Sequence, residues 1–186
     1  MKKSMAAAVA ALLLAGCTGE TGNLEPTQTT TATPTTSPTE SPTTATTTPT
    51  PEPAPEEAAA QQAVIDFWKM RDELGIDPEL SVTRLSEVAR GQALDVHRRA
   101  LIDQAREGLR QVGSGVVTPT SATPGPEEDQ MIVTACLDVA NVDVVDSAVE
   151  SIVPATRPDR VAYDYTVENG GDRWYVIEDL LEAKAC

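Results

Sequence analysis

The spacing of the hydrophobic residues between positions 56 and 186 changes near Gly113. Before this glycine, apolar residues recur every three or four positions, which is the period of an amphipathic helix. After it, β-branched residues gather in short runs separated by Gly and Pro, which is typical of strands and turns. Helices followed by antiparallel strands predict an α+β domain over residues 56–186.

The first half of this domain predicts three helices, at residues 55–75, 77–90 and 92–111. Pro55 and the two glutamates after it suit a first helical turn, because proline needs no amide partner there and acids oppose the helix dipole. The apolar stripes contain Ala60, Val64, Phe67, Trp68 and Leu74 in the first helix, Leu80, Leu85 and Val88 in the second, and Leu94, Leu101, Ala105 and Leu109 in the third.

The second half predicts a strand from Val116 to a loop at 124–126, and a long strand at 131–145 with a bulge near Asn141. Ile152 and Val153 could form a short edge strand, although their surroundings are mixed, and Pro154 and Pro158 mark another loop. These strands are rich in Val and Ile, which favour a pleated, half-buried surface.

The clearest pair of strands is a hairpin of residues 160–168 and 173–181 around the turn Asn169-Gly170-Gly171-Asp172. A four-residue turn places Glu168 opposite Arg173 and Val167 opposite Trp174. In that register, one face of the hairpin is apolar and aromatic and contains Tyr163, Tyr165, Val167, Trp174 and Val176.

The N-terminal residues 1–16 are typical of a secretory signal. Lys2 and Lys3 precede an apolar run that is too short to span a bilayer, which takes about 20 apolar residues. The run ends in Leu14-Ala15-Gly16-Cys17, which resembles the bacterial lipobox. This resemblance implies that Cys17 is lipidated, as with palmitate, and becomes the mature N-terminus. The expected location is therefore the outer face of the cell membrane.

Residues 17–55 predict a disordered linker after the lipidated cysteine. Between Thr18 and Pro55 there are 16 Thr, eight Pro, one Leu and no aromatic residue. Such a segment cannot bury enough apolar surface to offset the entropy of ordering. The linker is expected to hold the domain away from the lipid surface, and Thr/Pro-rich composition of this kind is also typical of O-glycosylated stalks.

The charge of the chain argues against one class of partner. The net charge is -15 and the pI is about 4.3. Nucleic acids are bound through their phosphates by a basic face, so no nucleic-acid partner is expected. The membrane is instead expected to be reached through the lipid on Cys17.

Helices packed on a meander of this length look like the cystatin-like, nuclear transport factor 2-like fold, in which the sheet is curved. A closer resemblance is to uncharacterised secreted lipoproteins of high-GC Gram-positive bacteria. It rests on the segments Cys136-Leu137-Asp138-Val139, Val142-Asp143-Val144-Val145-Asp146, Arg157-Pro158-Asp159-Arg160, Tyr165-Thr166-Val167-Glu168 and Arg173-Trp174-Tyr175-Val176, with Tyr163. These motifs look structural, and the resemblance brings no catalytic residues.

The remaining cysteines, Cys136 and Cys186, form an even pair in a domain expected to be exported. An oxidising compartment favours a disulfide between them. A reactive thiol or a metal site has less support, because the chain has one histidine and no Cys-x-x-Cys pattern.

Two sets of residues are candidates for a site. His97 lies at the margin of the third helical stripe and could act as a general base with an acid such as Asp164, although no spacing matches a catalytic motif. A small-molecule cavity could be lined by Phe67, His97, Tyr163, Tyr165 and Trp174. Aromatic residues at these positions are more often simple core.

Asp138, Asp143, Asp146 and Glu150 suggest calcium at first sight, but apolar residues interrupt the tight ligand spacing that calcium loops need. Neither a metal nor a cofactor is therefore expected.

The favoured hypothesis is a membrane-anchored, non-catalytic ligand-binding or protein-interaction module. Its partner would be a small apolar ligand, an envelope protein or a second copy of the chain. The alternative is a small-molecule hydrolase, isomerase or cyclase that uses a pocket in the cone-shaped fold.

Overall fold

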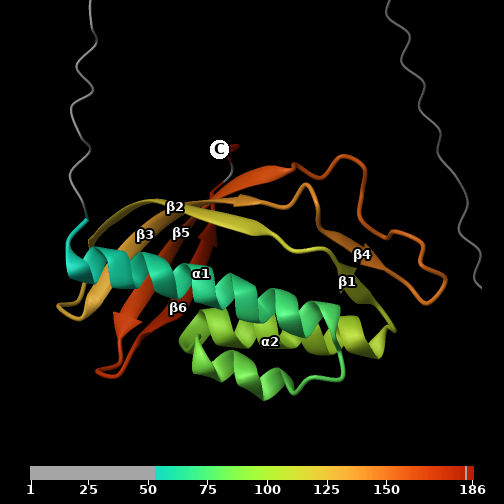
Figure 1. Ribbon diagram of the computed structural model, residues 1–186, viewed down its shortest axis with the longest axis horizontal. Helices are drawn as coiled ribbons and strands as arrows, with labels where there is room; N and C mark the ends of the chain where they lie inside the picture. The colour runs from blue at the N-terminus through green and yellow to red at the C-terminus, as the bar shows by residue number, and fades with distance from the viewer. Residues whose placement is uncertain (1–52, 183) are drawn as a thin grey trace, which may run out of the picture. The chain divides into compact units, whose positions relative to one another are not determined.

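The computed structural model describes residues 53–182 and 184–186 (Figure 1). The predicted signal and Cys17 lie outside the described residues, as does nearly all of the linker. Within the described part of the chain, no helix combines the length and the apolar character needed to cross a membrane.

Two α-helices and a short 3-10 helix form one layer. Their bounds are α1 Pro55–Ile76, η1 Val82–Glu87 and α2 Gly91–Arg106. The first helix is confirmed. The second prediction was wrong in type and length, because the Asp77 carboxylate accepts the Glu79 amide at 3.1 Å and holds a turn before η1 begins.

The third helix ends five residues earlier than predicted. The amides of Gly108 and Leu109 donate to the carbonyls of Ala105 and Gln104 at 3.1 and 2.9 Å, and Gly108 has a φ of 70°. This is a Schellman cap, which needs the left-handed conformation that glycine adopts without strain. The residues after it are released from the helix and form β1 (Arg110–Val112).

The main sheet is antiparallel with the strand order β2-β3-β5-β6. Its strands are β2 Val116–Pro124, β3 Gln130–Asp138, β5 Arg160–Asn169 and β6 Trp174–Leu181. α1 contacts all four strands and α2 contacts β6, so the helices cover one face of the curved sheet (Figure 1). This confirms the predicted fold class, α+β with N-terminal helices packed on a curved antiparallel sheet.

The long strand predicted at 131–145 is two strands in two sheets. The Asp138 carboxylate accepts the Ala140 amide at 3.0 Å and ends β3. The Arg157 guanidinium then donates to the carbonyls of Val139 and Val142 at 2.9 and 2.7 Å, which holds the turn. β4 (Asp143–Val145) pairs with β1 beside the main sheet. Gly113 allows this approach, since a Cβ there would lie 1.9 Å from the Asn141 carbonyl oxygen.

The hairpin is confirmed, but its predicted register was wrong by two residues, because Val167 was expected opposite Trp174 and Glu168 opposite Arg173. Asn169 lies opposite Trp174, and Val167 lies opposite Val176. The pairing then shifts, so that Thr166 faces Glu178 and Ile177 is the extra residue of a β-bulge. A bulge of this kind sends the residues beyond it to the opposite face from the one that simple alternation predicts.

The predicted disulfide joins Cys136 and Cys186, whose Cα atoms are 5.7 Å apart. Cys136 lies on β3 on the face of the sheet away from the helices, paired with Thr118 on one side and Ala162 on the other. The bond therefore attaches the C-terminal residues to the outer face of the central strands.

Candidate functional site

Three of the aromatic residues predicted to line a cavity, Phe67, Tyr163 and Tyr165, lie between the helices and the sheet, where their rings and that of Trp68 fill the space. Phe67 and Tyr165 are 0% exposed, and the Trp68 indole N–H donates to the Tyr165 hydroxyl at 2.7 Å. The rings of Tyr163 and Tyr165 stack at 5.7 Å between centroids. Edge-to-face and offset contacts of this type are favourable in a packed core. These four side chains therefore form the interior of the domain.

His97 belongs to the same cluster. Its ring meets those of Phe67 and Trp68 edge to face, at centroid distances of 4.9 and 5.7 Å. Its Nε2 lies 2.9 Å from Asp179 Oδ2, and the two side chains are 12% and 8% exposed. This pair links α2 to β6 across the helix–sheet interface.

The acid considered as the partner of His97, Asp164, lies on the other face of the sheet. There its carboxylate accepts the Thr134 hydroxyl at 2.7 Å. Asp179 was not predicted as the partner of His97, because strict alternation along β6 would place its side chain on the outer face of the sheet. The bulge at Ile177 turns it inward, opposite Tyr165. The sequence carried one signal of this bulge: Tyr175 and Ile177 interrupt the polar pattern expected on the outer face of the hairpin.

Charged groups surround Tyr163 and Tyr165. Burial raises the pKa of the Tyr163 phenol, the nearby Asp179 carboxylate raises it further, and Arg71 lowers it. Burial also raises the pKa of Tyr165 well above its ordinary value, against the opposing effect of the Trp68 hydrogen bond. Among the described residues, two buried side-chain atoms lack a hydrogen-bond partner, Arg71 Nε and Asp179 Oδ1. The interface is therefore polar at one end as well as aromatic.

Arg71 connects this cluster to a second buried polar group. Its guanidinium donates to the side chain of Gln111, lies 3.8 Å from Asp72 and sits 5.7 Å from the centroid of the Trp68 ring. Gln111 donates in turn to Asp72 at 2.7 Å, and Asp72 accepts the Gly115 amide at 2.9 Å. Burial lowers the pKa of Arg71, and the Asp72 carboxylate opposes that shift. These bonds fix β1 and the start of β2 against α1.

A histidine held by a carboxylate resembles the base and orienting group of many acid–base catalysts. A base must also reach a substrate proton, within about 3.2 Å or through one water. Here Phe67 and Trp68 pack against the imidazole, and none of the pockets described for this chain is lined by His97 or Asp179. The geometry is that of a closed polar bridge.

The acids weighed as calcium ligands cap turns instead. Asp146 accepts the amides of Ala148 and Glu150 at 2.9 and 3.0 Å, and Asp143 accepts the Ser151 hydroxyl at 2.7 Å. Within the described ranges, no group of three or more His, Cys, Asp or Glu is arranged to hold a metal ion.

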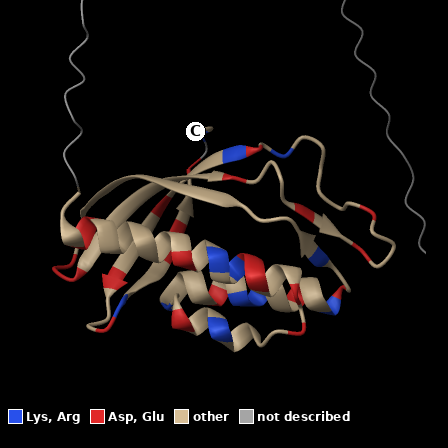
Figure 2. Ribbon diagram, viewed as in Figure 1, with Lys and Arg blue, Asp and Glu red and all other residues tan. Residues whose placement is uncertain are grey.

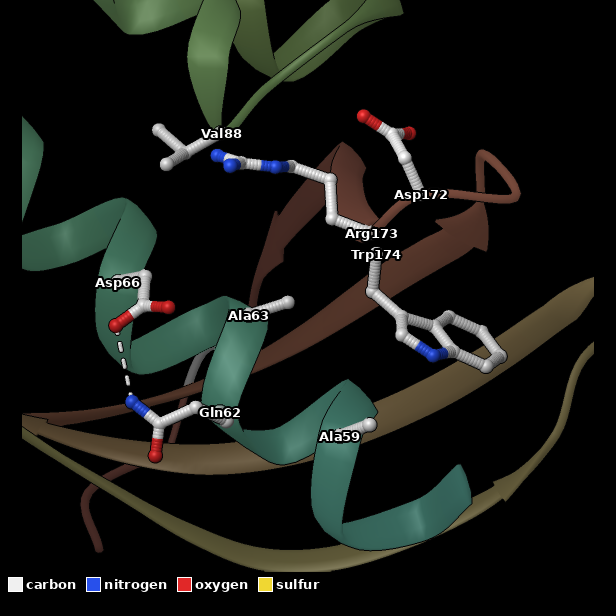
Figure 3. A pocket seen from close by; sticks show the side chains of 8 residues that line it. All are labelled: Ala59, Gln62, Ala63, Asp66, Val88, Asp172, Arg173 and Trp174. Carbon is white, nitrogen blue, oxygen red and sulfur yellow. Dashed lines mark hydrogen bonds between the residues drawn. The ribbon is translucent and has the colours of Figure 1, made fainter. Parts of the chain in front are cut away.

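Of the predicted cavity residues, Trp174 lines an open pocket (Figure 3). This pocket has a volume of about 420 Å³ and lies between α1, Val88 and the β5–β6 turn. The Trp174 indole borders the pocket near Ala59, while Gln62 donates to Asp66 at 2.9 Å along α1. The remaining lining residues are Ala63, Val88, Asp172 and Arg173. Unlike the aromatic interior, this pocket is accessible from solvent.

Comparison with known proteins shows a likeness in fold and assigns no activity to this chain. No protein-family model matches the chain, and no curated protein matches it. The chain is similar to the intermembrane-space region of the chloroplast protein ARC6, with 18% identity and a TM-score of 0.56 over 71% of this chain and 100% of that one. At that identity the likeness shows a shared fold alone.

Two further solved structures are less similar. One is a proposed aromatic ring hydroxylase from Novosphingobium aromaticivorans, with 11% identity and a TM-score of 0.45 over 67% of this chain and 86% of that chain. The other is the Kfla4162 protein from Kribbella flavida, with 14% identity and a TM-score of 0.39 over 67% and 90% of the two chains. Neither likeness is close enough to support an argument about this chain.

Proposed function

We propose that this protein is a lipid-anchored, extracytoplasmic interaction module that binds its partner on its surface and performs no catalysis. The anchor is the lipid on Cys17, and residues 18–54 serve as the tether. Support for the anchor comes from the Leu14-Ala15-Gly16-Cys17 motif behind a short basic and apolar segment. Support for the compartment comes from the disulfide, since such bonds persist in oxidising environments.

The filled helix–sheet interior is the observation that carries the non-catalytic part of the proposal. An enzyme of the alternative class needs a concave pocket around its acid and base. Here Phe67 and Tyr165 are fully buried, and His97 is bonded to Asp179 beneath aromatic rings. The pocket at Trp174 opens to solvent instead, which favours recognition of another molecule at the surface.

The alternative is a small-molecule hydrolase, isomerase or cyclase that uses His97 as a base. The 2.9 Å contact between His97 and Asp179 favours it, because a carboxylate in this position orients the imidazole of a general base. His97→Gln, in a full chain screened for turnover of esters and ketones, tests this function. Activity that the variant loses while its melting temperature is retained would support the enzyme and overturn the non-catalytic proposal.

Anchoring is tested by metabolic labelling of the full chain with an alkyne-bearing palmitate analogue in a Gram-positive host. We expect label on the wild-type chain and on a Thr18→Ser control, and none on Cys17→Ser, which should appear in the medium. Equal labelling of Cys17→Ser, or membrane retention without any label, would overturn the anchor.

The filled interior is tested by native mass spectrometry of the Cys17→Ser full chain recovered from the medium. We expect the bare mass of the chain, with the two hydrogens of the disulfide missing. Additional mass that leaves on denaturation would reveal a bound small molecule and would contradict a filled interior.

A further inference from the structure

The pocket at Trp174 has the features of a binding groove and shares no lining residue with the His97–Asp179 bridge. One wall is the first half of α1, where Ala59 and Ala63 present small side chains and allow close approach to the helix (Figure 3). The opposite wall is the β5–β6 turn with Asp172, Arg173 and Trp174. A volume of about 420 Å³ lies within the range of about 300–1,000 Å³ typical of ligand sites. The groove is large enough for one long side chain of a partner.

Acidic residues gather at this end of the domain, at the start of α1 and in the β2–β3 and β5–β6 turns (Figure 2). Asp66 and Asp172 line it directly. The acidic β2–β3 turn, Glu127 to Asp129, lies next to the β5–β6 turn, since the Asn169 amide donates to the Asp129 carbonyl at 2.8 Å. Two further glutamates, Glu56 and Glu57, begin α1 one turn before Ala59. The potential at this end of the domain therefore attracts cations.

The two arginines at this end are committed to contacts within the domain. Arg90 lies 3.6 Å from the Glu168 carboxylate, and its guanidinium stacks 3.5 Å from the centroid of the Tyr175 ring. Arg173 donates to the Glu87 carbonyl at 2.9 Å and points along the Val88 wall, away from the Trp174 indole (Figure 3). Asp66 accepts the Gln62 amide at 2.9 Å and Asp172 accepts the Tyr175 hydroxyl at 3.4 Å. Because an ionised carboxylate can accept several hydrogen bonds, both retain acceptor capacity and negative charge toward an incoming group.

We propose that this groove binds a basic segment of a protein partner, with one Arg or Lys side chain placed against the Trp174 indole and neighbouring basic residues directed toward Asp66 and Asp172. Tryptophan attracts cations over its ring more strongly than the other aromatic residues do, and arginine is the most frequent partner. Charge complementarity of this kind also speeds association and excludes acidic partners. The inference rests on the proposed function and names where that module binds and what it recognises.

The test measures binding of a fluorescein-labelled, N-acetylated and C-amidated nona-arginine peptide to the Cys17→Ser full chain at low and moderate salt. Fluorescence anisotropy gives the Kd, and quenching of Trp174 reports proximity, because Trp68 is buried in the core. We expect saturable binding that weakens with salt, as exposed charge pairs do.

Two variants of the groove are compared with a charge-matched control. Trp174→Leu should raise the Kd by about two- to fivefold, the range of a cation–π contact near solvent. Asp66→Asn with Asp172→Asn should raise it by up to about tenfold, because two exposed charge pairs are lost. The control, Glu79→Gln with Glu107→Gln, removes the same charge beyond the C-terminal ends of α1 and α2 and should leave the Kd nearly unchanged.

Several outcomes would overturn the groove. Equal weakening by the groove pair and the control pair would mean diffuse attraction by net charge. Unchanged binding in both Trp174→Leu and the Asp66/Asp172 variant would place the peptide elsewhere, as would a wild-type chain that fails to bind at low salt. The result is separable from the proposed function, because labelling of Cys17 does not depend on the groove. Loss of binding with intact labelling would leave an anchored module whose partner binds another surface.

Discussion

The two faces of the main sheet are built from alternate residues of the same strands, yet they are stabilised by different interactions. On the face toward the helices, Val133, Tyr165 and Val167 are 0% exposed. On the outer face, hydroxyls bond to carboxylates across the strands, as Thr134 does with Asp164, and a disulfide crosses the surface. Burial of apolar area therefore stabilises the inner face, while polar pairs and a covalent link stabilise the outer face. Substitutions should therefore separate the two faces by the size of their effects.

The largest effect is expected on the inner face at Phe67. Phe67→Ala removes a fully buried ring from the centre of the interface and should lower the free energy of unfolding by about 3–5 kcal/mol. Urea denaturation of the full chain measures it, with Val96→Ala on the exposed side of α2 as the control. A loss near that of the control would mean that the interior tolerates space and would reopen the possibility of a ligand cavity.

The next effect is expected on the outer face at the disulfide. Replacement of Cys136 and Cys186 by serine opens a link between residues 50 positions apart and should cost about 2–4 kcal/mol, as native disulfides of this kind do. Denaturation of the double variant and of the reduced wild-type chain, each compared with the oxidised wild-type chain, measures it. Unchanged stability in both would show that the polar pairs alone suffice to hold the outer face.

A third prediction concerns the polar bridge within the inner face. Asp179→Ala leaves the His97 imidazole buried without its partner, which should cost about 1–3 kcal/mol. A double-mutant cycle with His97→Ala isolates the coupling of the pair, because it subtracts what each truncation costs alone. Additive effects would mean that the two side chains do not interact in solution, and that the bulge positions Asp179 without consequence.

A fourth prediction uses the buried tyrosines. The pKa of Tyr165 is raised in the folded chain, so its stabilising contribution is fully present below pH 10 and is lost as the pH rises beyond the unfolded value. The unfolded chain then releases a proton that the folded chain retains, and stability should fall by up to about 1.4 kcal/mol for each pH unit. Tyr165→Phe should reduce this alkaline slope, measured by urea denaturation between pH 9 and about 11. An unchanged slope would assign the pH dependence to other groups.

The comparison of faces also explains what the sequence could predict. Hydrophobic period and the residues of the first helical turn located α1, and alternation located the β5–β6 hairpin, because these signals are local. The same signals placed part of β1 in the third helix. The alternation of Tyr163, Tyr165 and Val167 correctly assigned their face. The partner of His97 could not be found in this way, since it depends on a single extra residue at Ile177 that reverses the side of Asp179. The division of the long strand was missed for a similar reason, because Arg157 stabilises that turn from a distant loop.

The smallest effect should come from neighbouring positions of one strand, where the comparison is most direct. Val133 faces the helices and is fully buried, whereas Thr134 faces outward and donates to Asp164 at 2.7 Å. Thr134→Val keeps the shape and removes one hydrogen bond, so it should cost less than about 1 kcal/mol, the upper end for a cross-strand pair. Val133→Ala, one residue away, should cost about 2 kcal/mol through lost burial and a residual void. Urea denaturation of both variants measures the difference in the free energy of unfolding. A larger loss in Thr134→Val than in Val133→Ala would contradict the comparison of the two faces, since polar pairing on the outer face would then contribute more than burial beneath the helices.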